Sequence, residues 1–356
     1  MKAVRYAEYG ATPVLTDVPD PDCPANGVVV AVRATGVCRS DWHAWRGHDP
    51  VPLPHVPGHE LAGEVAEVGP DVTRWRVGDR VTVPFVCGCG TCAYCAAGEA
   101  QVCPHQTQPG FTGPGSFAER VALHAADVNL VRLPDTLDFT TAASLGCRFA
   151  TAFRALTVHG RPRDGDWLAV HGCGGVGLSA VQIGVALGAR VVAVDVNPAA
   201  LRLAGELGAE ALVDATGIGT PAVVHEITGD GAHVSVDALG SPATAVASVR
   251  SLRRRGRHVQ VGLLLGDAAT PPVPMDLVVA RELELYGSHG MAAHEYPAML
   301  AMVADGTLRP DRLVGAVIDL AEAGAALVAL DGTPSVGMTV VTLGGNDPRP
   351  VSDTTG

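Results

Sequence analysis

The residues that decide the fold of this chain are W-L-A-V-H-G-C-G-G-V-G at positions 167–177. An apolar run at 167–171 is followed by glycines with the spacing G-x-G-x-x-G, and then by apolar residues at helical spacing up to 187. The glycine spacing alone is a weak signal. A strand before it and a helix after it are the context of a dinucleotide-binding turn. The stretch therefore predicts the first βαβ unit of a doubly wound sheet.

The glycines of this turn have separate tasks. Gly172 permits the tight turn, Gly174 lets the backbone approach a pyrophosphate, and Gly177 lets helix and strand pack closely. The helix that follows offers unpaired N–H groups and a partial positive charge in its first turn. We expect the cofactor-binding glycines to be Gly172, Gly174, Gly175 and Gly177.

An acidic residue follows the turn at the distance that a dinucleotide site requires. Asp195 lies 18 residues after Gly177, near the end of the apolar run 190–196. A carboxylate there can accept hydrogen bonds from both ribose hydroxyls and would repel a 2′-phosphate, which favours NAD over NADP. The alternative is that Asp195 only caps the helix expected to open at Pro198.

The chain changes character near residue 148. After it, strand-like runs alternate with helix-length segments, with further strands expected at 190–196, 211–213, 233–238, 257–262 and 283–287. Apolar strands separated by helices predict a parallel sheet covered on both faces. Before it, short strands broken by Gly and Pro favour an irregular, mostly β domain over 1–147, to which 290–356 are expected to return.

Charge and hydropathy exclude several classes of partner. The formal net charge of -12 argues against nucleic acid, and the basic run at 253–257 is expected to end a helix, with Gly256 just beyond its last turn. No apolar run is long enough to span a membrane. Residues 1–6 alternate like a strand and lack a signal sequence, so we expect a cytoplasmic protein with no membrane partner.

Four of the nine cysteines form a compact motif, C-x2-C-x2-C-x7-C. Four thiolates this close in sequence can complete a tetrahedral shell around one zinc ion and leave no open position for chemistry. In a reducing cytosol, metal ligation is favoured over disulfides. The predicted structural zinc ligands are Cys89, Cys92, Cys95 and Cys103.

A second set of possible ligands is scattered: Cys38, the sequence Gly58-His59-Glu60, and Cys147. Together with the cysteine motif, the glycine turn and Asp195, in this order, the chain resembles the zinc-dependent alcohol dehydrogenases of the medium-chain dehydrogenase/reductase superfamily. The resemblance implies an α/β protein with a GroES-like, mostly β catalytic domain (1–147 and 290–356) and a Rossmann-type NAD-binding domain (148–289).

The resemblance also implies a catalytic zinc held by Cys38, His59 and Cys147, and hence two zinc ions per chain. Three protein ligands leave the fourth position for a substrate oxygen. Bound zinc lowers the pKa of an alcohol, whose hydride then passes to nicotinamide. The expected reaction is reversible hydride transfer between a primary or secondary alcohol and NAD, with the aldehyde or ketone as the other partner.

The remaining site residues are carried over by position. Ser40 matches the residue that hydrogen-bonds the substrate oxygen, and His43 the far end of a proton relay, with the ordinary histidine pKa suiting it to that task. Asp41 is expected to orient His59. Glu60 is expected behind the metal or as a transient ligand. The expected cofactor contacts are Arg39 at the pyrophosphate, Thr151 and Gly262 at the nicotinamide. Solvated surface positions are the alternatives for His43 and Arg39.

Some features depart from the family or stay open. Arg148 follows a zinc ligand where familiar members carry glycine, and the loop 46–50 is polar where yeast-type enzymes carry a bulky aromatic residue. Phe85 matches a substrate-pocket position, but a core role is nearly as well supported. The substrate and its size therefore cannot be inferred from the family.

Three alternative functions compete with this expectation. They are a specialised polyol dehydrogenase or zinc-dependent reductase, a zinc-free quinone or enoyl reductase, and a non-catalytic NAD-binding scaffold. The short segment 103–115 resembles the tetrameric bacterial members, and the strand 283–287 could pair across a two-fold axis, so a homotetramer is favoured over a dimer.

Overall fold

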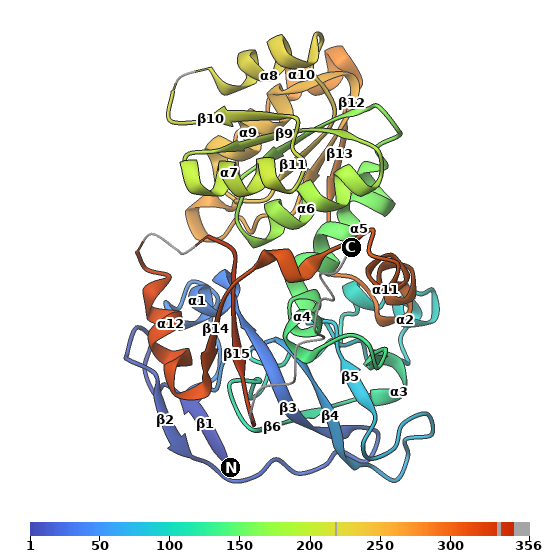
Figure 1. The fold of residues 1–356 in the computed structure, drawn as a ribbon, viewed down its shortest axis with the longest axis vertical. Helices are drawn as coiled ribbons and strands as arrows, with labels where there is room; N and C mark the ends of the chain where they lie inside the picture. Colours follow the sequence, from blue (N-terminus) through green and yellow to red (C-terminus); the bar gives the residue numbers. More distant parts are fainter. Residues whose placement is uncertain (218, 333–335, 345–356) are drawn as a thin grey trace, which may run out of the picture. The chain divides into compact units, whose positions relative to one another are not determined.

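The computed structural model describes residues 1–217, 219–332 and 336–344, which form two compact units (Figure 1). The first unit contains residues 1–147, 290–304 and 310 onward, and the second contains residues 148–289 and 305–309. Residues 345–356, which fall within the predicted catalytic domain, lie outside the described residues. The assignment of these units as functional domains stays a prediction.

The second unit is built on a six-stranded sheet with the order β10-β9-β8-β11-β12-β13. Every neighbouring pair is parallel, which confirms the predicted doubly wound sheet. The strands are β8 (Trp167–His171), β9 (Arg190–Asp195), β10 (Ala211–Asp214), β11 (Ala232–Asp237), β12 (Leu252–Gln260) and β13 (Glu284–Gly287). The helices are α5 (Ala150–Arg154), α6 (Gly175–Ala186), α7 (Pro198–Glu206), α8 (Thr220–Thr228), α9 (Pro242–Arg250) and α10 (Met275–Arg281).

Alternating side chains of β8 show that helices cover both faces of this sheet. Trp167 and Ala169 pack in a core cluster with Val224 of α8. Leu168, which points the opposite way, lies against Gly184 of α6, where an added Cβ would be 2.5 Å from its Cδ2. Successive strand residues face opposite sides of a sheet, so α6 and α8 lie on opposite faces.

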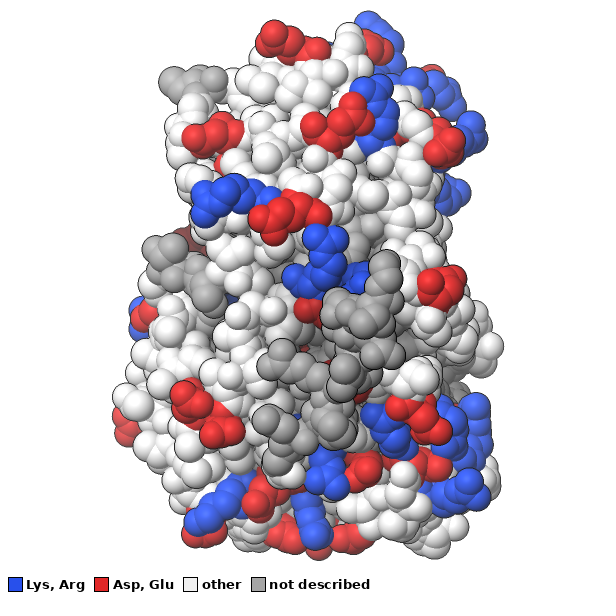
Figure 2. Space-filling view, viewed as in Figure 1, with Lys and Arg blue, Asp and Glu red and all other residues white. Residues whose placement is uncertain are grey.

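The prediction for the basic run was wrong. Helix α9 ends at Arg250, and residues 253–257 belong to strand β12. Acidic residues just before and at the start of the neighbouring strand compensate the charge: Arg255 pairs with Glu282 at 2.6 Å and Arg257 with Glu284 at 3.3 Å. Basic and acidic side chains are likewise intermixed over the face drawn in Figure 2.

The last residue of β8, His171, gives this unit a predicted pH dependence. The side chain is fully buried, and burial, reinforced by nearby His258, lowers the pKa of His171 to about 3. Between this value and 6.5 the unfolded chain binds a proton that the folded chain does not, so stability is lost as pH falls below 6.5. We expect a loss of about 2 kcal/mol between pH 6.5 and about pH 5 from this residue.

Chemical denaturation across this pH range tests the assignment. His171→Leu should reduce the acid-induced loss of stability by about 2 kcal/mol, whereas His124→Gln, at an exposed histidine, should leave that loss as in the wild type. An equal slope in both variants would contradict the role given to His171.

The first unit is organised around the long central strand β3, which pairs with β4, β6 and β15. The seven-stranded sheet has the order β14-β15-β3-β4-β5-β7, with β6 also on β3, and a separate hairpin joins β1 and β2. The strands are β1 (Lys2–Arg5), β2 (Val14–Asp17), β3 (Val28–Val37), β4 (Glu60–Val68), β5 (Arg80–Thr82), β6 (Arg120–Leu123), β7 (Val131–Arg132), β14 (Val314–Asp319) and β15 (Met338–Thr342).

Short helices lie between the strands of this unit. They are α1 (Arg39–Trp45), α2 (Ala93–Ala96), α3 (Ala126–Asn129), α4 (Phe139–Ala143), α11 (Tyr296–Ala304) and α12 (Ala323–Ala329). The expected mostly β character of this part is thus present, with candidate ligands placed at strand ends and helix starts. In the described residues, no helix combines the length and apolar character needed to cross a bilayer.

Candidate metal and cofactor sites

Four side chains from three places in the sequence converge in the first unit. Cys38 follows β3 and caps the N-terminus of α1, His59 immediately precedes β4, Glu60 begins β4, and Cys147 lies in a π-helical turn at 145–149. One ligand atom from each lies within 4.8 Å of the others, and all four residues are buried. Two sulfurs, an imidazole nitrogen and a carboxylate form a donor set that suits zinc.

The histidine of this cluster shows the clearest sign of a metal position. His59 Nδ1 donates to Asp41 Oδ1 at 2.9 Å, which leaves Nε2 as the atom available to a cation. Nε2 is buried and has no hydrogen-bond partner among the described residues. Burial alone would lower the pKa of His59, but Asp41 and then Cys38 raise it well above 6.5. The surroundings therefore favour a positive charge at Nε2, and a metal ion can supply it in place of a proton.

Asp41 joins two of the ligand-bearing segments. Its Oδ2 accepts a hydrogen bond from the Cys38 backbone N–H at 3.1 Å, within the first turn of α1. Its Oδ1 accepts a second one from the Gly58 backbone N–H at 3.0 Å, beside the contact with His59. One buried carboxylate thus fixes the position of Cys38 and the ring orientation of His59.

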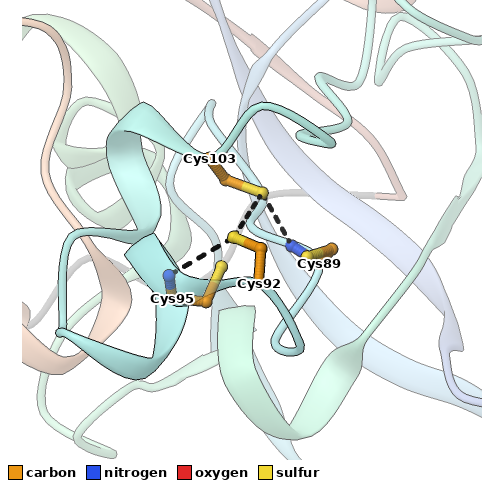
Figure 3. A group of neighbouring side chains, drawn as sticks. All are labelled: Cys89, Cys92, Cys95 and Cys103. Atoms are coloured by element: carbon orange, nitrogen blue, oxygen red, sulfur yellow. Dashed lines mark hydrogen bonds between the residues drawn. The ribbon is translucent and has the colours of Figure 1, made fainter.

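The four-cysteine motif forms a second cluster in the same unit (Figure 3). The sulfurs of Cys89, Cys92, Cys95 and Cys103 all lie within 4.8 Å of one another. The Cys92 and Cys103 sulfurs are 3.7 Å apart, and backbone N–H groups of Cys89 and Cys95 point at the sulfurs of Cys103 and Cys92 at 3.4 and 3.5 Å. Backbone donors stabilise thiolates, so the cluster fits a closed zinc site.

The thiols of this cluster have unlike proton affinities. Hydrogen bonds from the Thr91 side chain and backbone lower the pKa of Cys89 to about 5. Desolvation, with the sulfurs of Cys92 and Cys103 close by, raises the pKa of Cys95 to about 12. A cation is therefore needed to hold all four groups as thiolates at neutral pH.

The two relay candidates lie on α1 beside the first cluster. Ser40 Oγ is 3.9 Å from the Cys38 sulfur. His43 contacts a residue that the sequence did not single out as functional, because its Nδ1 lies 3.3 Å from Nδ1 of exposed His48. Burial, then the nearby charges of His48 and Arg39, lower the pKa of His43 to about 4, against the ordinary value that was expected. His43 is thus neutral at physiological pH and a weaker base than an exposed histidine.

Two aromatic rings lie close to the ring of His59. Phe85 lies edge-on with ring centroids 6.0 Å apart, and Phe111 lies closer, at 5.1 Å. Phe111 was not predicted, because its segment carries no motif and only tertiary structure brings it near. Arg39 donates from Nη1 to the Leu330 carbonyl at 2.6 Å. Phe85 therefore adjoins the ligand cluster, and Arg39 is anchored to the first unit.

In the second unit, the glycine turn has the geometry that the sequence predicted for it. Gly172 has φ +90°, where a side chain would be strained, and an added Cβ at Gly177 would be 1.7 Å from the Gly172 carbonyl oxygen. Nothing lies within 4 Å of an added Cβ at Gly174, which is the N-cap of α6. The turn thus leaves space at Gly174 for a ligand to approach the backbone.

Asp195 lies against this turn. Its Oδ2 accepts the Cys173 backbone N–H, and its Oδ1 accepts the Asn197 backbone N–H at 2.7 Å. The cap of α7 is the Asn197 side chain, which accepts from Ala199 N at 2.9 Å. Capping of α7 therefore does not explain Asp195, and its carboxylate is held at the end of β9 beside the glycines.

The two other predicted cofactor contacts are placed as follows. Thr151 is buried on α5, which packs against α6. An added Cβ at Gly262 would be 2.1 Å from the Gly240 backbone nitrogen, so close backbone packing already explains this glycine. The cysteines outside both clusters, Cys23, Cys87 and Cys173, are free thiols in this structure.

The fold and the two clusters together define a zinc-binding dehydrogenase of two-unit design. The family models for an alcohol dehydrogenase GroES-like domain and for a zinc-binding dehydrogenase match residues 24–135 and 175–305. An alcohol dehydrogenase from Geobacillus stearothermophilus is 35% identical over 312 residues, covering 87% of this chain and 90% of the relative. The chain belongs to the zinc-dependent alcohol dehydrogenases of the medium-chain dehydrogenase/reductase superfamily.

Solved structures agree with this membership. A structure described as an NAD-dependent alcohol dehydrogenase matches with a TM-score of 0.87 and 31% identity, covering 97% of this chain and all of that one. A zinc-binding dehydrogenase of Sinorhizobium meliloti 1021, solved with NADP, matches with a TM-score of 0.85 and 28% identity, covering 96% and 99%. The GroES-like and Rossmann-type architecture is thus confirmed over nearly the whole chain.

Proposed function

We propose that this protein is a zinc- and NAD-dependent alcohol dehydrogenase that transfers hydride reversibly between a primary or secondary alcohol and the nicotinamide. The observation that carries the proposal is the buried cluster of Cys38, His59, Glu60 and Cys147, in which His59 Nε2 faces the other ligand atoms without a hydrogen-bond partner among the described residues. A zinc-free reductase or a scaffold protein needs no such set. Relatives with this fold are named alcohol dehydrogenases.

The residues take the following parts in the proposed reaction. Cys38, His59 and Cys147 hold the catalytic zinc, with Asp41 fixing the ring of His59 and Glu60 close enough to serve as an additional ligand. When bound, zinc supplies Lewis acidity toward the alcohol oxygen and NAD accepts the hydride. Cys89, Cys92, Cys95 and Cys103 hold the structural zinc.

Proton removal falls to side chains of α1. Ser40 hydrogen-bonds the substrate oxygen and passes its proton toward His43, which is neutral and, as a weak base, passes the proton on rather than retaining it. The Nδ1 contact with His48 then offers a route to solvent, because His48 is exposed. Arg39 and Thr151 complete the set as contacts to the pyrophosphate and the nicotinamide, with Gly262 near the ring.

A panel of primary, secondary and polyhydric alcohols, assayed by NADH absorbance with metal-quantified protein, tests the proposal. We expect turnover with at least one alcohol, and reduction of the matching carbonyl by NADH. Failure in both directions by protein that carries two zinc ions per chain would reject it.

Asp195 gives a prediction about the choice of coenzyme. Asp195→Gly removes a negative charge that would face a 2′-phosphate, so the ratio of kcat/KM for NADP to that for NAD should rise by roughly tenfold or more. The relative solved with NADP supports the view that this fold accepts either coenzyme.

A second variant for this experiment is Asp195→Asn. It removes the charge but keeps one acceptor oxygen, which can serve one of the two N–H groups of Cys173 and Asn197, so it should also relax the preference. Steady-state kinetics with both coenzymes that show an unchanged ratio in both variants would remove Asp195 from this role.

We also propose a cytoplasmic homotetramer. Strand β13 ends the described six-stranded order and has one side open for pairing with a second copy. Light scattering coupled to gel filtration would decide between tetramer, dimer and monomer.

A further inference from the structure

Arg148 is a charged residue in a place where burial is costly. It follows Cys147 in the π-helical turn and is only 8% exposed. A guanidinium keeps its charge at all physiological pH values, so its burial requires compensating contacts. The Arg148 side chain lies beside the glycine turn of the same unit, where a bound phosphate could provide one of these contacts.

The side chain of Arg148 lies across the first residue of α6. A Cβ added to Gly175 would be 2.4 Å from Arg148 Cδ and 3.2 Å from both Nε and Nη1. The G-x-G-x-x-G pattern does not require a glycine at this position, and no positive φ demands one. Gly175 is therefore explained by Arg148, because any larger residue would displace the arginine.

The two sides of the turn thus differ. At Gly174 the space beyond the backbone is open, and at Gly175 it is filled by the Arg148 side chain. Among the described residues no side chain caps the N-terminus of α6, so its first N–H groups are available to a ligand. The accessible backbone at Gly174 and the positively charged Arg148 side chain at Gly175 are therefore adjacent, in the turn where a dinucleotide pyrophosphate binds.

We propose that Arg148 is a cofactor-binding residue whose guanidinium contacts the pyrophosphate of NAD, together with the N-terminus of α6. The proposal rests on the proposed function and extends it to a residue that departs from the glycine of familiar members. A guanidinium can give two parallel hydrogen bonds to a phosphate, and both gain strength where water is excluded. Thr151, three residues later in α5, is the expected contact for the adjacent nicotinamide.

An acidic substrate is the competing ligand for this cation. The contact with Gly175 favours the cofactor, because it places the stem and the Nε and Nη1 atoms beside α6. The two possibilities predict different measurements: a cofactor contact changes the affinity for ADP-ribose, which carries the pyrophosphate but no substrate group, whereas a substrate contact does not.

Isothermal titration calorimetry with ADP-ribose and the zinc-loaded, full-length protein tests the proposal. We expect Arg148→Met to weaken binding by roughly 10- to 100-fold, and Arg148→Lys by less. Arg250→Met, which removes an exposed arginine from the end of α9, is the matched control and should bind as the wild type does.

A double-mutant cycle keeps the test decisive if Arg148→Met does not fold. Gly175→Ala should weaken ADP-ribose binding in the wild type because its Cβ displaces Arg148, and should add little in an Arg148→Ala background. Undiminished binding by a folded Arg148→Met, a rise confined to the KM for alcohol, or additive effects in the cycle would overturn the proposal. In each of these cases the wild type still binds ADP-ribose and oxidises alcohol, so the proposed function stands. A wild type that binds no ADP-ribose would overturn both.

Discussion

Cys147→Ser is expected to abolish turnover while leaving the fold intact. The substitution exchanges a thiolate for a poor zinc ligand in a buried set that also contains Cys38 and His59. Loss of a direct ligand should lower kcat/KM by more than about 10²- to 10³-fold. This decrease is larger than the one expected from changing a residue that only orients a ligand. Zinc content should fall from two ions per chain to about one.

Metal analysis, steady-state kinetics and circular dichroism on the same preparation measure these effects. Cys23→Ser is the control, because Cys23 lies outside both clusters and should retain two zinc ions and full activity. Retained activity in Cys147→Ser, or one zinc ion or none in fresh wild-type protein, would remove the catalytic site from the position assigned to it.

Cys103→Ser is expected to reduce stability, and its effect on activity should follow from the loss of structure. Cys103 is fully buried and its sulfur accepts hydrogen bonds from the backbone of Cys89 and His105, so its loss disrupts the ligand set and the loop around it. A structural zinc contributes directly to folding, and the segment 89–103 contains only one turn of α-helix and one of 3-10 helix. We expect the variant to bind one zinc ion fewer. Its free energy of unfolding should fall by about 3 kcal/mol or more.

Thermal denaturation with and without a chelator measures this contribution. Cys87→Ala is the matched control: Cys87 is buried in the hydrophobic core, burial raises its pKa to about 12, and it belongs to neither cluster. The control should keep both zinc ions and remain sensitive to the chelator. A Cys103→Ser protein with unchanged Tm and metal content would contradict a structural role for the cluster.

Local patterns were sufficient for part of the molecule. Strand β8 was predicted with its observed bounds, and α6 to within one residue at each end, because the apolar run and the glycines restrict both the conformation and the packing there. The four-cysteine cluster follows from spacing alone. The convergence of Cys38, His59 and Cys147 came only from the family resemblance, since no local pattern relates them.

The features that were missed depend on contacts between distant segments. The basic run was taken for a helix end because Gly256 resembles a C-cap, yet it lies in β12, where Arg255 and Arg257 form ion pairs with acidic residues 27 positions later. The contact of Arg148 with Gly175, and that of Phe111 with His59, likewise join segments far apart in sequence. The depressed pKa of His43 required knowledge of its burial and of His48 beside it.

The hydrogen bonds of Asp41 have a consequence for metal uptake. Because one carboxylate ties the start of α1 to residues 58 and 59, two ligand segments become ordered as the chain folds, before any ion arrives. The conformational entropy of arranging these ligands is thus lost during folding rather than during binding. Apoprotein should accordingly reload by simple capture of the ion, with little rearrangement of the loops that receive it.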